Sequence, residues 1–294
     1  MNYYRLILII SIFLSGLTSY SQITHADSVL DDILNDDGYI SSIESTKKTF
    51  HFMYIRSGFD NATYYAGREV GDKQVNISQQ LSYFSSNGFS LGVSGAWYSQ
   101  TTPRYGTTVL NAGYGKSFGK QKSFRFSTSY NHYFYNTKDI DYTPTYHSAV
   151  NATISFRKKR IGTRLNLNTL LGQELGFSLS YGLYSRLTLI KFGKYNKLRF
   201  EPELNIYFSE ESVLHESIEF LETDNSLVYD YSYSDKFGLM NTQFRLPLTL
   251  IVGNFDFETG VVINLPRSLD PGISYNASSA YYVSIGYLFS LTKF

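Results

Sequence analysis

The sequence of 294 residues contains no cysteine, one tryptophan and three methionines. The lack of cysteine excludes a disulfide framework, a thiolate metal site and a cysteine nucleophile. Basic and acidic residues nearly balance, at 26 and 25, so no positive excess indicates a nucleic-acid partner. Beyond residue 17 the chain also lacks any apolar run of the roughly 20 residues that a membrane-spanning helix needs.

Aromatic residues, in contrast, are abundant. The chain has 27 tyrosines and 22 phenylalanines, yet its mean hydropathy is only −0.21. A transmembrane β-barrel has both properties, because alternating apolar and polar residues cancel in the average while aromatic girdles collect at both membrane interfaces.

The first 21 residues have the pattern of a secretory signal peptide. Arg5 precedes an apolar run from Leu6 to Leu17, and the small residues Ser19 and Ser21 lie just before Gln22. The run is too short to span a membrane as a helix, so we expect cleavage ahead of Gln22.

Residues 22–46 form an acidic extension. Apolar residues at helical spacing and Gly38 predict a short amphipathic helix. The acidic residues around them are Asp27, Asp31, Asp32, Asp36 and Asp37. One hypothesis is a plug that docks on arginines inside a barrel, and the alternative is a solvated periplasmic tether.

The last segment, 281–294, alternates sharply. One face carries large apolar residues, namely Tyr281, Val283, Ile285, Tyr287, Phe289 and Leu291. The other face is small and polar apart from Tyr282 and Leu288. Because successive strand residues point to opposite faces, a barrel in lipid would turn the first face outward and the second toward its interior.

This segment resembles the C-terminal assembly signal of bacterial outer-membrane β-barrels. The residues that carry the likeness are Ser284, Gly286, Phe289, Leu291 and the terminal Phe294. Three residues follow Leu291, which is a small departure. With the signal peptide and the strand pattern, the chain resembles Bacteroidota outer-membrane barrels at class level. The resemblance implies a Gram-negative outer membrane, contacts with its lipid and lipopolysaccharide, and insertion by the barrel-assembly machinery.

The fold expected for residues 47–294 is an all-β, antiparallel transmembrane barrel of about twelve strands, with ten or fourteen left open. The segments that alternate are roughly 48–58, 73–86, 88–100, 106–118, 122–136, 145–158, 160–172, 174–191, 196–209, 235–251, 254–265 and 278–293. Short turn-rich joins such as Asn87-Gly88 and Gly253-Asn254 mostly alternate with longer joins, as in outer-membrane barrels.

Alternation also assigns charged residues to the interior. They are Arg125, Arg157, Arg164, Arg186, Arg199, Glu201, Glu203, Arg245, Asp256 and Glu258. His51 and His147 are assigned inward by the same rule. Rings of charge set pore selectivity, so one interpretation is a constriction that favours anions. The alternative is a salt-bridge network that fills a narrow barrel.

The join 210–234 contains seven acidic residues and no lysine or arginine. We expect a solvated, partly disordered surface loop. The alternative is a site for divalent cations between lipopolysaccharides, because hard cations prefer carboxylate oxygens.

Catalysis is not expected. His215-Glu216-Ser217 resembles the exposed His-x-Ser pair of twelve-stranded outer-membrane phospholipases, but the following Asn-Gly is missing. No metal-ligand spacing and no cofactor motif is present in the sequence. We therefore expect a passive, porin-like channel for small polar or anionic solutes. The alternative is a structural or partner-binding protein with a filled lumen, as an accessory subunit of an envelope complex.

Overall fold

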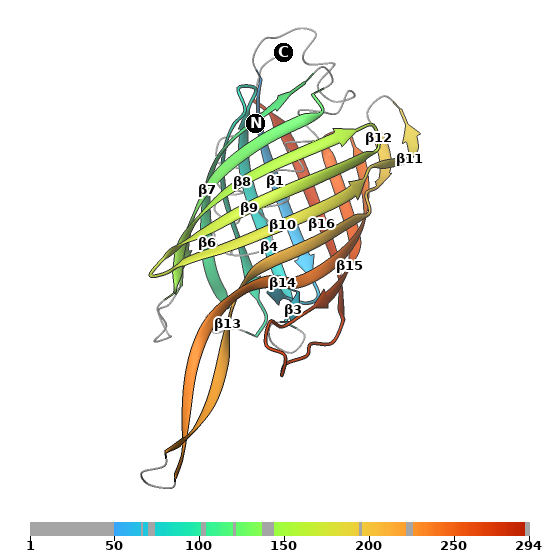
Figure 1. The fold of residues 1–294 in the computed structure, drawn as a ribbon. Helices are drawn as coiled ribbons and strands as arrows, with labels where there is room; N and C mark the ends of the chain where they lie inside the picture. The colour runs from blue at the N-terminus through green and yellow to red at the C-terminus, as the bar shows by residue number, and fades with distance from the viewer. Residues whose placement is uncertain are drawn as a thin grey trace.

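The chain folds into a closed, antiparallel β-barrel of twelve strands (Figure 1). The computed structural model describes residues 50–65, 67–69, 74–100, 104–119, 122–136, 144–193, 196–221 and 226–291. Within these ranges no helix is long and apolar enough to cross a membrane. The expected signal peptide 1–21 and acidic extension 22–46 lie outside the described residues.

The barrel strands follow one another around the wall in chain order. They are β1 (His51–Asp60), β4 (Asn76–Ser85), β5 (Phe89–Tyr98), β6 (Tyr105–Phe118), β7 (Phe124–Tyr135), β8 (Tyr146–Lys158), β9 (Ile161–Gly172), β10 (Leu175–Ser185) with β11 (Leu187–Phe192), β12 (Asn196–Phe200) with β13 (Glu203–Leu221), β14 (Ser226–Val252), β15 (Phe255–Pro266) and β16 (Ser278–Ser290). Two pairs count as single barrel strands, because β10 and β11 are separated only at Arg186, and β12 and β13 only at Glu201-Pro202.

The first and last strands close the ring. β1 pairs antiparallel with β16, from Phe52 opposite Ser290 to Asp60 opposite Tyr282. A closed sheet leaves no free edge, which is the only way a sheet can satisfy its backbone groups in lipid. The prediction of about twelve strands is confirmed.

The two ends of the barrel differ, and we name them by their connections. The turn end carries the short turns and also Phe50 and Leu291, where the described chain enters and leaves the wall. Its turns include glycines at positive φ, such as Gly88 at 90° and Gly119 at 93°, which tight hairpins require. The loop end carries the longer joins, including residues 61–75 with a small hairpin of β2 (Tyr64–Tyr65) and β3 (Arg68–Glu69).

Large apolar side chains cover the outside of the wall. Leu91, Ile154 and Phe244 are 46%, 52% and 39% exposed, and many similar residues surround the barrel at alternate positions. A protein in water does not expose so much contiguous apolar surface, whereas a barrel in lipid must. On β16 and just after it, five of the six residues that the sequence predicted to face outward are exposed, namely Tyr281, Val283, Ile285, Phe289 and Leu291. The sixth, Tyr287, is half-buried because its ring packs against Phe255 and Phe289.

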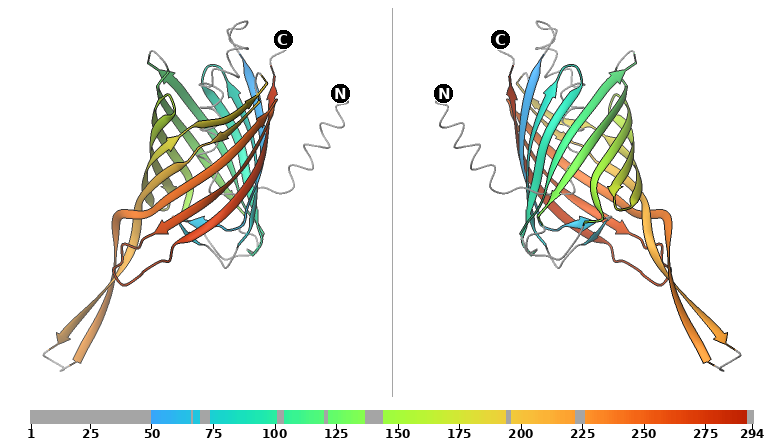
Figure 2. Two further views of the ribbon diagram at one scale, coloured as in Figure 1. Left: turned by 90° about the vertical axis from the view of Figure 1, so that its right-hand side faces the viewer. Right: turned by 90° about the vertical axis from the view of Figure 1, so that its left-hand side faces the viewer.

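A long ribbon projects from the loop end, and it corrects one expectation. β13 and β14 remain paired far beyond the wall, up to Leu221 opposite Ser226 (Figure 2). The prediction of a partly disordered loop over 210–234 is therefore wrong for the backbone of 210–221 and 226–234, which is paired strand. The segment is acidic, but it is also rich in the β-branched and aromatic residues that favour strands. The side chains of 212–233 are outside the description, so the cation hypothesis stays a prediction.

Candidate functional site

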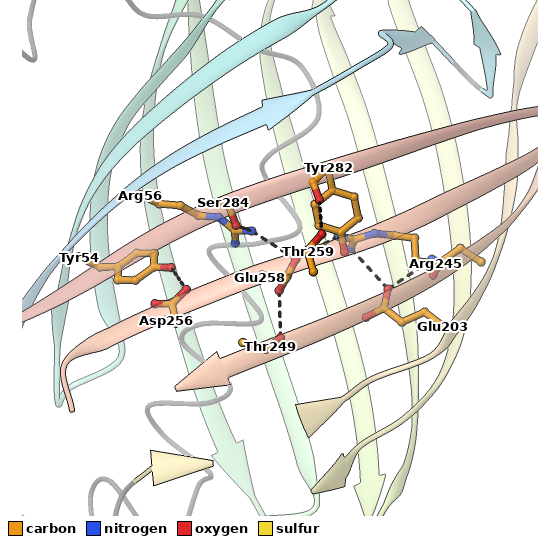
Figure 3. A network of polar contacts seen from close by, with 11 residues as sticks. Tyr54, Arg56, Glu203, Arg245, Thr249, Asp256, Glu258, Thr259, Tyr282 and Ser284 are labelled. Carbon is orange, nitrogen blue, oxygen red and sulfur yellow. Dashed lines mark hydrogen bonds and ion pairs between the residues drawn. The ribbon is translucent and has the colours of Figure 1, made fainter. Parts of the chain in front are cut away.

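A network of charged side chains lies inside the wall on β1 and β13–β16 (Figure 3). The carboxylate of Glu258 on β15 joins two arginines from different strands. Its Oε1 lies 3.3 Å from Nη2 of Arg56 and 3.6 Å from Nη2 of Arg245. Oε2 of the same group accepts a hydrogen bond from Thr249 at 3.4 Å. Buried charges are stable only with this kind of multiple pairing.

Arg245 extends the network across β14. Its Nη1 lies 3.6 Å from Oε2 of Glu203, and its Nη2 donates to the Tyr282 hydroxyl at 3.1 Å. The guanidinium also lies over the Tyr282 ring, 5.1 Å from the centroid, in cation–π geometry. Gly260 makes room for this ring, because a Cβ there would lie 2.7 Å from the Tyr282 hydroxyl oxygen.

Gly286 likewise makes room for side chains that pass over it. The Tyr54 hydroxyl on β1 donates to Oδ1 of Asp256 on β15 at 3.1 Å, passing over the intervening strand β16. A Cβ on Gly286 would collide with both side chains. Beside them, Nη2 of Arg56 donates to the Ser284 hydroxyl at 2.6 Å. Ser284 and Gly286, which the sequence assigned to an assembly signal, thus also shape the interior network.

A second charged group lies at the two strand interruptions. Arg186 pairs with Glu201, and Nη1 of Arg199 lies 3.9 Å from the same carboxylate. Arg199 is almost fully buried, at 2% exposure. Its guanidinium is therefore enclosed by neighbouring side chains, with the Glu201 carboxylate nearby.

The opposite wall is mostly uncharged. Asn111 donates to Asn131 at 2.6 Å, Thr153 donates to Asn166 at 2.9 Å, and Asn166 donates to Ser180 at 3.0 Å. Three arginines accompany these amides and hydroxyls, namely Arg125, Arg157 and Arg164 on β7, β8 and β9. The guanidinium of Arg164 lies 5.4 Å from the ring centroid of Tyr184. We call β4–β10 the amide wall, and β1 with β12–β16 the charged wall.

The sequence assigned ten charged residues to the interior. Three of them lie on the amide wall, six on the charged wall, and Arg186 lies between β10 and β11. Sequence reasoning missed Arg56 and Asp60, which interact electrostatically with each other and with Arg245. With them, the interior holds seven arginines and five acids among the described residues that we assign to it. All five acids lie on the charged wall or at Glu201, which lies at its edge, and the sequences of β7–β9 contain none.

Arg56 was missed because both faces of β1 look apolar. Phe52 and Tyr54 point inward with exposures of 1% and 2%, so alternation alone gave the wrong face. The inward assignment of His51 is accordingly wrong, since its Nδ1 bonds the Tyr83 hydroxyl at 2.6 Å on the outer face.

The inward assignment of His147 is also wrong. A bulge between Tyr146 and Ser148 shifts the register against β9. The ring of His147 thereby lies 6.0 Å from that of His132, on the outer face beside exposed Tyr130.

A separate cluster ties the join 61–75 down at the loop end. Nη1 of Arg68 lies 2.7 Å from Oε1 of Glu211, and its Nη2 donates to the Arg267 carbonyl at 2.8 Å. The guanidinium lies 4.2 Å from the ring centroid of Tyr275. Glu211 also accepts a hydrogen bond from the Leu269 amide at 2.6 Å. We call this set the mouth latch.

The pairing of β13 with β10 ends at Ser209, so Glu211 lies where β13 has already left the barrel wall. Burial opposes its ionisation, but hydrogen bonds from Arg68 and the Leu269 amide and the positive charge of Arg68 prevail. The pKa of Glu211 is therefore lowered below its usual value. No periodic sequence signal pointed to this latch.

The remaining sequence candidates are only partly visible. Phe289 and Leu291 lie on the outer face, while Phe294 and the acidic residues from Asp27 to Asp37 fall outside the described residues. The side chains of His215 and Ser217 are not described. In the part of the chain that is described, no group of three or more histidine, aspartate or glutamate side chains could hold a metal ion.

No protein-family model and no curated protein sequence matches the chain. Among solved structures, it is similar to a KdgM porin, with 11% identity, a TM-score of 0.45 and coverage of 81% of this chain and 99% of that one. It is also similar to a NanC porin, with 7% identity, a TM-score of 0.48 and coverage of 80% and 98%. LpxR from Salmonella typhimurium gives 10% identity, a TM-score of 0.43 and coverage of 80% and 100%. These likenesses concern barrel architecture and indicate neither a solute nor a reaction.

Proposed function

We propose that this protein is an outer-membrane barrel of a Gram-negative bacterium that acts as a passive channel for small polar solutes, with a preference for anions. The apolar belt on the outer face supports the membrane location, since it matches an acyl environment and no other. The turn end would then face the periplasm and the loop end the exterior, as in other barrels of this class.

The observation that carries the channel proposal is the chemistry of the interior. Amides, hydroxyls and paired charges line it, and such groups replace the hydration of a polar solute as it passes.

The preference for anions follows from where the charges lie. The acids of the charged wall each lie near at least one arginine, and that wall has two more acids than arginines. Arg125, Arg157 and Arg164 add positive charge to the amide wall, whose strands β7–β9 carry no acid. Lumen charges act strongly on ions in a narrow pore, because low-dielectric walls focus the field.

Reversal potentials in planar bilayers test this proposal. Under a KCl gradient we expect a current selective for chloride. Replacing Arg157 and Arg164 by glutamine should lower that selectivity several-fold. Lys116, which points outward near the same end, provides the matched control, and its replacement by glutamine should change nothing. Selectivity for potassium would contradict the anion preference.

A second candidate is a partner-binding envelope protein with a filled lumen. It is favoured by the bulky side chains of Phe52, Tyr54 and Phe84, which point inward and are at most 2% exposed. Purified barrel that inserts fully but gives no current would favour this candidate over the channel.

Assembly and surroundings complete the proposal. We infer that Ser284, Gly286, Phe289, Leu291 and Phe294 guide insertion by the barrel-assembly machinery. The outer face would contact phospholipid on one side and lipopolysaccharide on the other. We assign no catalytic activity and no cofactor to the chain.

A further inference from the structure

The turn end of the barrel is strongly basic along one arc of its rim. Three consecutive connections around the wall supply nine lysines and arginines and no acid, in residues 118–124, 157–161 and 189–198. Among those whose side chains are described, the exposed ones are Lys122, Lys158, Lys159, Arg160 and Lys191. We call this set the basic arc.

The rest of the same rim is neutral. The turn between β4 and β5 is Ser86-Asn87-Gly88, and the turn between β14 and β15 is Gly253-Asn254. The chain enters the barrel on this neutral side, because Phe50 and Ser86 exchange hydrogen bonds of 3.0 Å and 3.2 Å. Whatever precedes residue 50 is therefore tethered beside Asn87 and not beside the basic arc.

Lys47 and Lys48 lie just before the entry point, and the segment before them has the opposite charge. Residues 22–46 contain six acidic side chains and no lysine or arginine, and five of the six fall between Asp27 and Asp37. The interior has only two more arginines than acids, whereas the three connections of the basic arc supply nine basic residues. The basic arc has no acid in its own connections, so it is the stronger attractor for a negatively charged segment.

The tether is long enough to reach. Residues 38–49 can extend to about 40 Å, at roughly 3.3 Å per residue. Twelve strands spaced about 4.8 Å apart and tilted by about 40° enclose a barrel roughly 25 Å across. The tether can thus reach from the neutral side of the rim to the basic arc.

We propose that the acidic segment 27–37 docks on the basic arc. The contact is electrostatic and solvent-exposed, so it weakens as salt shortens the screening length from about 10 Å at 0.1 M to about 3 Å at 1 M. Docking of the segment is a separate matter from conduction by the barrel.

The absence of native cysteine allows a direct test by chemical cross-linking. We would place one cysteine at Asn35, which is uncharged within the acidic segment, and the second at either Arg160 or Asn87. Asn87 is the matched control, because it is exposed in a turn at the same end and lies next to the tether. A short bis-maleimide would be added to the purified full chain in zwitterionic detergent at low salt.

We expect Asn35→Cys to react with Arg160→Cys at least about tenfold faster than with Asn87→Cys, and to lose this advantage in 1 M NaCl. A segment that is merely tethered would favour Asn87→Cys, and that result overturns the proposal. So does a preference for Arg160→Cys that is insensitive to salt.

Charge reversal distinguishes direct pairing from a folding defect. Lys158, Lys159 and Arg160 replaced by glutamate, with the second cysteine moved to Ile161, should abolish the preference. Replacing Asp31, Asp32, Asp36 and Asp37 by lysine in the same variant should restore it. Failure of this rescue in a protein that still forms a barrel contradicts the pairing.

Anionic lipid headgroups are the competing ligand for the same lysines. The cross-linking is therefore repeated with phosphatidylglycerol added to the micelles. We expect the preference for the arc to persist. If the lipid erases it, the basic arc is a lipid-binding surface and the docking proposal fails.

Discussion

The charged wall and the amide wall are built by the same strand alternation, yet they connect their strands differently. In the amide wall, partners lie directly opposite each other on neighbouring strands, as with Thr153 and Asn166 or Asn166 and Ser180. In the charged wall, Tyr54 and Arg56 on β1 reach residues on β15 by passing over β16.

The comparison shows how side-chain length determines the reach of a contact. Short amides and hydroxyls satisfy their nearest neighbour, so each bond joins two adjacent strands. Tyrosines and arginines join strands that are not adjacent, and they need glycines such as Gly286 and Gly260 beneath them. The charged wall is therefore more tightly coupled and less tolerant of change.

The largest effect is expected from removing one partner of the charged network. Glu258→Ala leaves Arg56 and Arg245 with less compensation in the interior, so we expect a loss of about 3–5 kcal/mol in the free energy of unfolding. Urea unfolding in vesicles, followed by the fluorescence of the single Trp97, measures it.

Asn166→Ala is the matched change in the amide wall. It leaves one hydroxyl donor and one acceptor unpaired, which costs about 1–3 kcal/mol. Equal losses for Glu258→Ala and Asn166→Ala would end the distinction between the walls.

A smaller effect is expected from adding a methyl group. Gly286→Ala forces Tyr54 and Asp256 apart, and overpacking of this kind costs about 1–3 kcal/mol. Gly92→Ala in the amide wall makes one tight contact, with the Ser82 hydroxyl at 3.2 Å, which can move slightly, so its cost should be lower. In a Tyr54→Ala background, Gly286→Ala should cost less than it does in the wild type, because the ring that the methyl group meets is gone. If Gly92→Ala lowers the free energy of unfolding more than Gly286→Ala does, the contact that passes over Gly286 adds little to stability.

The smallest effect concerns the mouth latch, which attaches the join 61–75 to β13 of the charged wall. Because the folded pKa of Glu211 is lowered, its stabilisation is fully present above the unfolded glutamate pKa of about 4.3 and is lost as pH falls through the folded value.

Limited proteolysis at neutral and acid pH, with a protease active at both, checks this prediction. We expect cleavage near Arg68 to increase in acid, and Glu211→Gln to increase it already at neutral pH. Glu210→Gln provides the control on the adjacent residue. If Glu211→Gln cleaves like the wild type at neutral pH, the latch does not hold the join.

Much of the barrel could be predicted from the sequence because lipid imposes one rule on every strand. Large apolar residues must alternate with others, so strand positions and the faces of residues such as Arg245 and Glu258 can be read directly. The rule fails where both faces are apolar, as in β1, and at bulges, as at His147. It gives no information beyond the membrane, where the ribbon formed by β13 and β14 depends on strand propensity instead.

The latch could not have been predicted for a different reason. The three latch residues are far apart in the sequence. Arg68 lies between β1 and β4, Glu211 lies at the base of the ribbon on β13, and Tyr275 lies between β15 and β16. Their meeting depends on the closure of the barrel, and no local pattern records which joins lie next to each other once the ring is complete.

The ribbon has one mechanical consequence. β13 and β14 run from the interior ion pairs of Glu203 and Arg245 out to Leu221 and Ser226, with one irregularity at Tyr207–Phe208. A force applied to the distal tip would be transmitted along two hydrogen-bonded strands to Arg245, which contacts side chains on β13, β15 and β16. A partner that pulled on the tip of the ribbon would therefore strain the Glu203–Arg245 ion pair without entering the barrel.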